Sequence, residues 1–277
     1  MSCPDCFRGH DHHGPTTGFE TTLHGLQTYI TDPPKSSDKS SKHVIVIFSD
    51  AFGWATVNLR RLADSYARRT GCRVYLPDFM YGTAAPAWVK TNMDRISTEK
   101  GLWNMIMKPI LLVQAMCFFI PFSFRNHPPK RYPLMKKFMS DLRFAQTPGV
   151  RTGVVGFCWG AYGATHIARD GDKAANGVPL VDAVYTAHPS EVKVEDFVDI
   201  KVPYSLVIGD VDFAFAIDKV REVEKILGRN QEVESEVLVI PAARHGFAVR
   251  GNPDDEVEKG MADQAEDQLV RWFDLQL

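Results

Sequence analysis

The sequence predicts an α/β fold in which helices cover both faces of a doubly wound, mostly parallel sheet. The first sign is the apolar run at residues 43–48, which shows no alternation and so fits a strand buried on both faces. The second is that helix-like and strand-like stretches alternate along most of the chain. A Gly-x-Cys-x-Gly motif at residues 156–160 joins one such strand to one such helix.

Length and composition are those of an ordinary globular protein. The 277 residues are 44% hydrophobic and 24% charged, and we expect residues 1–277 to form one domain. The net charge of -2 indicates neither nucleic-acid binding nor an anionic membrane. The start of the chain is not a signal or transit peptide, and the five scattered cysteines suit a reducing compartment. A cytoplasmic location is expected.

Residues 1–18 form a polar N-terminal arm that contains part of a metal-site pattern. Cys3 and Cys6 are spaced as zinc ligands, and three histidines follow at His10, His12 and His13. Zinc requires four ligands, and no second cysteine pair follows at zinc-finger spacing. We therefore favour an arm without metal, and a zinc-binding interaction arm stays open as the alternative.

The first half of the chain predicts a hairpin, two strands and a helix. Residues 20–23 and 26–30 flank a His-Gly turn, and a polar connection leads to the buried strand at 43–48. The helix is indicated by apolar residues at its spacing and by a glycine stop, namely Leu59, Leu62, Ala63, Tyr66 and Gly71. Residues 73–76 form the next strand.

Residues 79–131 have the least regular pattern, and we expect a lid or cap there, over the end of the sheet where ligands bind. Residues 105–124 within this region are strongly apolar. Pro109 and Pro121 bracket about a dozen of them, too few to cross a bilayer, so no stable membrane span is expected. A dimer contact, a membrane-surface contact and a core helix stay open for this stretch.

The second half continues the alternation. A helix is indicated by Met135, Phe138, Met139 and Leu142, and it leads into the strand before the Gly-x-Cys-x-Gly motif. Three strands are expected at residues 181–187, 204–208 and 237–240, with a helix at about 217–227 between the last two. A C-terminal helix is expected to bury one face, made of Val257, Met261, Ala265, Leu269 and Trp272 or Phe273.

The Gly-x-Cys-x-Gly motif matches a nucleophile elbow, which is a sharp turn between a strand and a helix. Because the two elements approach closely, a side chain at Gly156 or Gly160 is expected to collide with its surroundings. Cys158 at the tip would stand at a helix N-terminus, where the dipole and free N–H groups favour a thiolate. A buried structural cysteine is the alternative.

Polar residues follow the carboxyl ends of the predicted strands, where a doubly wound sheet binds ligands. Asp50 follows the first buried strand, Asp210 and Asp212 follow a later one, and His245 follows the last. Nucleophile, acid and histidine in this order is the chain order of α/β-hydrolases. We therefore predict that fold, with a catalytic triad of Cys158, Asp212 and His245.

The sequence offers a second candidate for the acid and for the histidine of the triad. Asp212 is preferred over Asp210 because Gly-x-x-Asp lets the chain turn before it presents the carboxylate. His188 precedes the acid, so we interpret it as a pocket or structural residue. The substrate oxyanion would be bound by the backbone N–H groups of Trp159 and Ala51.

These motifs resemble the dienelactone hydrolase family of α/β-hydrolases, in particular its fungal-type branch. The resemblance covers most of the chain from about residue 43 onward, apart from residues 79–131. It rests on Ser-Asp-Ala-Phe-Gly at 49–53, Gly-Phe-Cys-Trp-Gly at 156–160, Gly-Asp-Val-Asp at 209–212 and His-Gly-Phe at 245–247. It implies hydrolysis of an enol-lactone through a thioester on Cys158, without metal or cofactor.

The family pattern also implies roles around the nucleophile. Bacterial members carry Glu at the place of Asp50, where it contacts the thiol, so Asp50 is expected to gate the nucleophile with a shorter side chain. Arg250 lies one residue beyond the place of a family arginine that binds the substrate carboxylate. Arg250, Phe52 and Phe247 are expected to bind substrate, while a second family arginine has no match in residues 79–131.

We therefore expect a cysteine hydrolase that cleaves a lactone or activated ester of a small, carboxylated molecule. Two other functions stay open: a thioesterase or acyl-transfer enzyme that binds an apolar acyl chain against residues 105–124, and a non-catalytic ligand receptor on a hydrolase fold. The expected partner is the small-molecule substrate, and a homodimer stays open.

Overall fold

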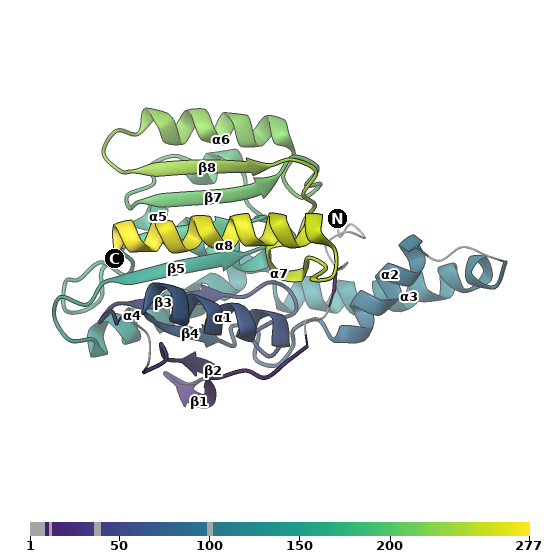
Figure 1. The fold of residues 1–277 in the computed structure, drawn as a ribbon, viewed down its shortest axis with the longest axis horizontal. Helices are drawn as coiled ribbons and strands as arrows, with labels where there is room; N and C mark the ends of the chain where they lie inside the picture. The colour runs from purple at the N-terminus through teal and green to yellow at the C-terminus, as the bar shows by residue number, and fades with distance from the viewer. Residues whose placement is uncertain (1–8, 11–12, 36–39, 99–101) are drawn as a thin grey trace.

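An eight-stranded sheet forms the centre of the protein (Figure 1), whose computed structural model describes residues 9–10, 13–35, 40–98 and 102–277. The strands stand in the order β1-β2-β4-β3-β5-β6-β7-β8. Neighbours from β4 to β8 are parallel, whereas β2 is antiparallel to both β1 and β4. The predicted doubly wound, mostly parallel sheet is confirmed.

The strands lie close to the predicted positions, with ends that shift by one or two residues. They are β1 (Phe19–Leu23), β2 (Leu26–Thr31), β3 (Val44–Phe48), β4 (Arg73–Pro77), β5 (Thr152–Phe157), β6 (Ala183–Ala187), β7 (Tyr204–Gly209) and β8 (Ser235–Ile240).

Helices cover both faces of the sheet. They are α1 (Val57–Thr70), α2 (Ala87–Thr98), α3 (Leu102–Arg125), α4 (Pro128–Ala145), α5 (Trp159–Asp170), α6 (Ile217–Arg229), α7 (Phe247–Arg250) and α8 (Glu256–Gln276), with a short 3₁₀ turn η2 (Val194–Phe197). Side chains of α1 and α8 pack with Ile45 and Val155 on one face, and those of α4, α5 and α6 pack with Val46 and Val154 on the other. Successive residues of each strand thus face opposite apolar layers, which explains the runs without alternation.

The sequence prediction is correct at the end of α1 and wrong at the start of α8. Gly71 ends α1 in the left-handed conformation with φ of 74°, as its position predicts. Val257 is 66% exposed, so its assignment to the buried face of α8 is wrong. It lies in the first turn of α8, whereas the buried residues of this helix begin at Ala265, where the helix reaches the core.

The region between β4 and α4 forms a helical hairpin. Helices α2 and α3 pair with each other and project from the body of the protein (Figure 1). Pro109 and Pro121 lie inside α3, which is 24 residues long, so the prolines do not limit the apolar stretch to the dozen or so residues between them. Both prolines are exposed, where water can bond the carbonyls that lose their partner. The role of a lid stays a prediction.

The length of α3 also bears on whether this helix could cross a bilayer. Within the described part of the chain, one stretch, Ile106–Arg125, is long and apolar enough to cross a bilayer. The apolar stretch of α3 is therefore longer than the dozen or so residues between Pro109 and Pro121, and the expectation that it is too short to cross a bilayer is wrong. Length and composition alone are weak support for a span, because core helices and signal sequences share them.

The turn from β5 into α5 depends on two glycines. A Cβ at Gly160 would lie 2.2 Å from the backbone oxygen of Phe48, and one at Gly156 would lie 2.7 Å from the Cα of Ala161. Backbone cannot move aside as the end of a flexible side chain can. The collisions predicted from the sequence are confirmed. Because Gly156 and Gly160 have no Cβ, α5 can pass close to β3 and β5.

We expect Gly160→Ala to lower the free energy of unfolding by at least about 2 kcal/mol, because its Cβ must displace the backbone of β3. The matched control is Gly228→Ala in α6, where an added Cβ meets no atom within 4 Å. This control should be neutral or stabilising by up to about 1 kcal/mol. Urea unfolding curves measure both, and equal effects of the two substitutions would contradict the steric argument.

Candidate active site

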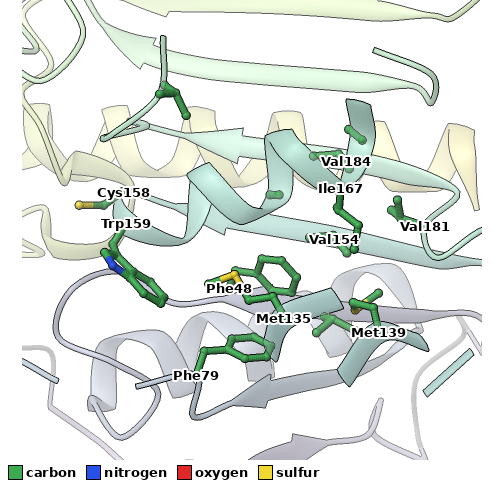
Figure 2. Packing of buried hydrophobic residues seen from close by; sticks show 14 of the residues in the cluster. Phe48, Phe79, Met135, Met139, Val154, Cys158, Trp159, Ile167, Val181 and Val184 are labelled. Atoms are coloured by element: carbon green, nitrogen blue, oxygen red, sulfur yellow. The ribbon is translucent and has the colours of Figure 1, made fainter. Parts of the chain in front are cut away.

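Cys158 occupies the tip of the sharp turn between β5 and α5. Its backbone has φ of 47° and ψ of -110°, which is unusual for a residue other than glycine and is characteristic of strained functional turns. The Cys158 N–H donates to the carbonyl of Ala187 at the end of β6. Figure 2 shows the sulfur pointing away from the packed side chains of the core, such as Phe48 and Met135.

Cys158, His245 and Asp212 are buried and lie in contact with one another, although they come from three separate loops. The Nε2 atom of His245 lies 3.1 Å from the Sγ atom of Cys158. The Nδ1 atom of His245 lies 2.9 Å from one carboxylate oxygen of Asp212 and 3.0 Å from the other. This is the arrangement of a nucleophile, a base and an orienting acid.

The electrostatic environment holds a proton on His245. Burial lowers the pKa of this imidazole, but Cys158 and Asp212 outweigh burial and raise the pKa from 6.5 to about 9. These charges therefore favour an imidazolium at neutral pH. Because the pKa is raised in the folded state, this charge stabilises the fold fully below pH 6.5 and ceases to do so as the pH rises through about 9.

The rival residues have other contacts. Asp210 accepts a hydrogen bond from the N–H of Ala242 at 2.7 Å and so caps a turn. His188 is fully buried, and its ring lies 5.0 Å from that of His245 and stacks on Phe157. Burial is the largest influence on His188 and lowers its pKa to about 4, so this ring is neutral beside the imidazolium.

The two residues expected to bind the oxyanion contact the stems of the projecting hairpin. Ala51 follows β3, and its carbonyl accepts from the N–H of Ala85, just before α2. Trp159 is the first residue of α5, where backbone N–H groups have no partner within the helix. The indole Nε1–H of Trp159 donates to the carbonyl of Asn126, directly after α3, at 2.6 Å.

Asp50 and Arg250 form a buried ion pair close to Cys158. An oxygen of Asp50 accepts from the guanidinium of Arg250, and the other accepts from the N–H of Phe52 at 3.0 Å. The Arg250 guanidinium also lies over the ring of Phe52, at 5.1 Å. Burial raises the pKa of Asp50, Arg250 opposes this, and the charge of Cys158 raises it further. Gating by Asp50 and carboxylate binding by Arg250 stay predictions.

Phe247 and Arg250 line a surface cavity of about 590 Å³ that reaches His245. Gly9 and His10 border the same cavity, and the N–H of His10 donates to the carbonyl of Arg250. The described part of the N-terminal segment therefore lies against the site.

Sequence reasoning missed one polar contact of Cys158, made by Ser190. The hydroxyl of Ser190 lies 3.5 Å from the Sγ atom of Cys158, and the N–H of Ser190 donates to the carbonyl of Cys158. The available signal was its place just after β6, whose carboxyl end adjoins that of β5. His188 and Glu191 beside it have positive φ, a feature the sequence does not reveal.

The zinc hypothesis concerns residues that are mostly outside the described part of the chain. Cys3, Cys6 and His12 lie outside the described residues, so the hypothesis of a zinc site stays untested. Among the described residues, no group of three or more His, Cys, Asp or Glu side chains is arranged to hold a metal ion.

The fold and the site define an α/β-hydrolase. A solved structure of a putative dienelactone hydrolase from Klebsiella pneumoniae has the same fold, with a TM-score of 0.62, 19% sequence identity and coverage of 94% of this chain and 99% of that one. The pattern of the dienelactone hydrolase family matches residues 26–276. The chain belongs to this family and is a hydrolase that acts on esters or lactones.

Curated relatives are similar along almost their whole length. Hydrolase pyvD of Aspergillus violaceofuscus is 26% identical over 268 residues, which cover 97% of this chain and 94% of that protein. The human carboxymethylenebutenolidase homolog is 23% identical over 283 residues, which cover 98% of this chain and 96% of that protein.

We expect the His245 imidazole to titrate near pH 9 in the wild type and at a much lower pH in Cys158→Ala. Cys158 is the largest influence that raises this pKa, and burial opposes it. NMR of the imidazole nitrogens across pH 5–10 measures both values. An unchanged pKa in Cys158→Ala would show that the sulfur does not hold the proton on His245.

Proposed function

We propose that the protein hydrolyses its ester or lactone substrate through a thioester on Cys158. The observation that carries this proposal is the 3.1 Å contact between His245 Nε2 and Cys158 Sγ, at the tip of a strained elbow. A raised pKa of His245 supports proton transfer from the thiol to the imidazole. The thiolate, rather than the thiol, is the nucleophile.

In the first half of the reaction, the Cys158 sulfur attacks the carbonyl carbon of the substrate. Negative charge moves to the carbonyl oxygen, which the N–H groups of Ala51 and Trp159 would stabilise. When the intermediate collapses, the bond to the leaving oxygen breaks and His245 gives that oxygen its proton. A lactone would remain attached through the acyl group, with its ring opened.

In the second half, water replaces the leaving group. His245 removes a proton from the water while the oxygen attacks the thioester carbonyl. The carbon–sulfur bond breaks, and the carboxylic acid product leaves. Asp212 holds His245 in one orientation through both halves, and a second hydrogen bond from the Ala214 N–H fixes that carboxylate.

The substrate we propose is a small lactone or activated ester that carries a carboxylate. The names of several relatives, dienelactone hydrolase and carboxymethylenebutenolidase homolog, refer to lactones. Arg250 is a cation near the proposed nucleophile that could bind a carboxylate, and it is paired with Asp50. A carboxylated substrate would therefore compete with Asp50 for Arg250, and this exchange would couple substrate binding to the charge beside Cys158.

A second candidate is a thioesterase or acyl-transfer enzyme for an apolar acyl group. One observation favours it, a cavity of about 480 Å³ at the base of the hairpin. Its lining includes Ala84, Pro86, Phe118, Pro121, Phe122 and Arg125. Ala84 adjoins Gly53 in the loop that carries Ala51, so an acyl chain in this cavity would lie near the proposed oxyanion site.

We expect Cys158→Ala to lower hydrolysis by at least about a thousandfold, and Cys158→Ser to keep at most about 1% of it, because a hydroxyl ionises far less readily than a thiol. Assays would use a panel of carboxylated lactones, short esters and long-chain thioesters, and the preferred class separates the two candidates. Intact-mass detection of acyl-Cys158 separates both from a receptor. Retention of most activity in Cys158→Ala would exclude this nucleophile.

We expect Asp212→Asn to lower kcat by at least about a hundredfold, because the amide would favour the wrong tautomer of His245. The matched control is Asp210→Asn, which can still accept from the Ala242 N–H and should change kcat less than about threefold. Thermal unfolding should show similar stability for both variants. The reverse ranking of activities would move the acid to Asp210.

A further inference from the structure

The outer face of α3 is an exposed apolar surface. We use this name for Ile106, Ile110, Val113, Met116, Ile120 and Phe124, whose exposed fractions run from 49% to 69%. Their spacing of three and four residues places them along one side of the helix for five turns. An apolar surface of this length on a projecting hairpin is uncommon in a soluble protein and indicates an interaction site.

The opposite side of α3 is already occupied by the protein. Leu111, Ala115, Phe119 and Phe122 are buried, and Phe118 packs edge-on against Trp88 of α2 at 5.7 Å. The hairpin is thus held together by its inner side. The outer face is not needed for that packing, so it is available for a partner.

The charge around the hairpin differs from that of the rest of the chain. The hairpin, residues 87–125, contains five Lys and Arg and two Asp and Glu, a net +3 in a chain whose total is -2, so the remainder carries -5. Arg125 and Lys130 are exposed next to Phe124. Among the described residues, neither cation is paired with a carboxylate. The partner of this surface should therefore carry negative charge beside an apolar layer.

We propose that the outer face of α3 docks the protein on the surface of an anionic lipid bilayer. Apolar side chains would enter the boundary between headgroups and acyl chains, while Arg125 and Lys130 would contact the acidic headgroups. The net charge of the whole chain does not indicate such binding, because acidic residues elsewhere outweigh the positive charge of the hairpin.

Two features favour docking over a span. One side of α3 is covered by protein, and α2 carries polar residues on the hairpin, where Asn92 donates to Gln114 of α3 at 3.2 Å. Exposed Thr91 and these amides would have to enter hydrocarbon if the hairpin crossed the bilayer. Lying in the interface leaves them at the level of the headgroups.

The same charge argues against a second copy of the chain as the partner. Two outer faces packed together would bring two hairpins of net +3 close to each other, and α3 contains no Asp or Glu that could pair with the cations of the other copy. An anionic membrane removes this repulsion and replaces it with attraction. Docking would also bring the site close to the lipid, because both stems of the hairpin contact Ala51 or Trp159.

The test is flotation of the full-length protein with large unilamellar vesicles. Vesicles of phosphatidylcholine with about 30% phosphatidylserine should bind it at least about tenfold more tightly than phosphatidylcholine alone. The triple variant V113S/I120S/F124S should lose at least about tenfold in binding. Its matched control is F144S/V257S/L275S, which removes three apolar side chains of similar exposure elsewhere and should bind like the wild type.

The charge is tested separately. R125Q/K130Q should lose about tenfold in binding to the anionic vesicles and little on phosphatidylcholine, whereas K219Q/K225Q on exposed positions of α6 should change neither. Cys158→Ala should bind vesicles like the wild type, so this result does not depend on the proposed catalytic mechanism.

Three outcomes would overturn the proposal. The first is absence of binding to anionic vesicles, and the second is equal loss in V113S/I120S/F124S and its control. The third is a stable dimer in light scattering without lipid that V113S/I120S/F124S converts to monomer, since the outer face would then be an interface between copies of the chain.

Discussion

The close approach of β3, β5 and α5 at the elbow is the constraint on which the site depends. Gly156 and Gly160 leave no room for a Cβ there. Cys158 adopts its strained conformation at this turn, and Trp159 begins α5 where Gly160 lies against Phe48 and Ser49. The proposed nucleophile and both proposed oxyanion donors are therefore positioned by one packing contact, made by residues that carry no reactive group.

Two buried charge pairs lie side by side around the sulfur. His245 is held between Cys158 and Asp212, while Asp50 is held by Arg250. In a buried site the charge on each group depends on its partner, so a change at one group shifts the protonation of the other. A substrate that exchanged with one of these partners would therefore change the charge around the sulfur of Cys158, the proposed nucleophile.

The projecting hairpin is built onto this site without disturbing it. It enters after β4, at the edge of the sheet where loops carry function and tolerate insertion. Its stems contact the residues expected to bind the oxyanion, and its helices project from the body (Figure 1) with the outer face of α3 exposed. The hairpin thus joins an apolar, basic surface to the proposed catalytic centre through a few hydrogen bonds.

Local patterns determined most of the fold and the candidate residues in this protein. Apolar runs and turn residues located the strands, because buried strands need apolar residues and connections need turns, and the Gly-x-Cys-x-Gly motif located the elbow with its strand. Three features were decided by tertiary structure alone. Pro109 and Pro121 continue a helix because their side is exposed, Val257 is exposed because α8 begins beyond the core, and Arg250 meets Asp50 across 200 positions of sequence. Sequence spacing carries no information on such contacts, since they depend on where distant loops converge.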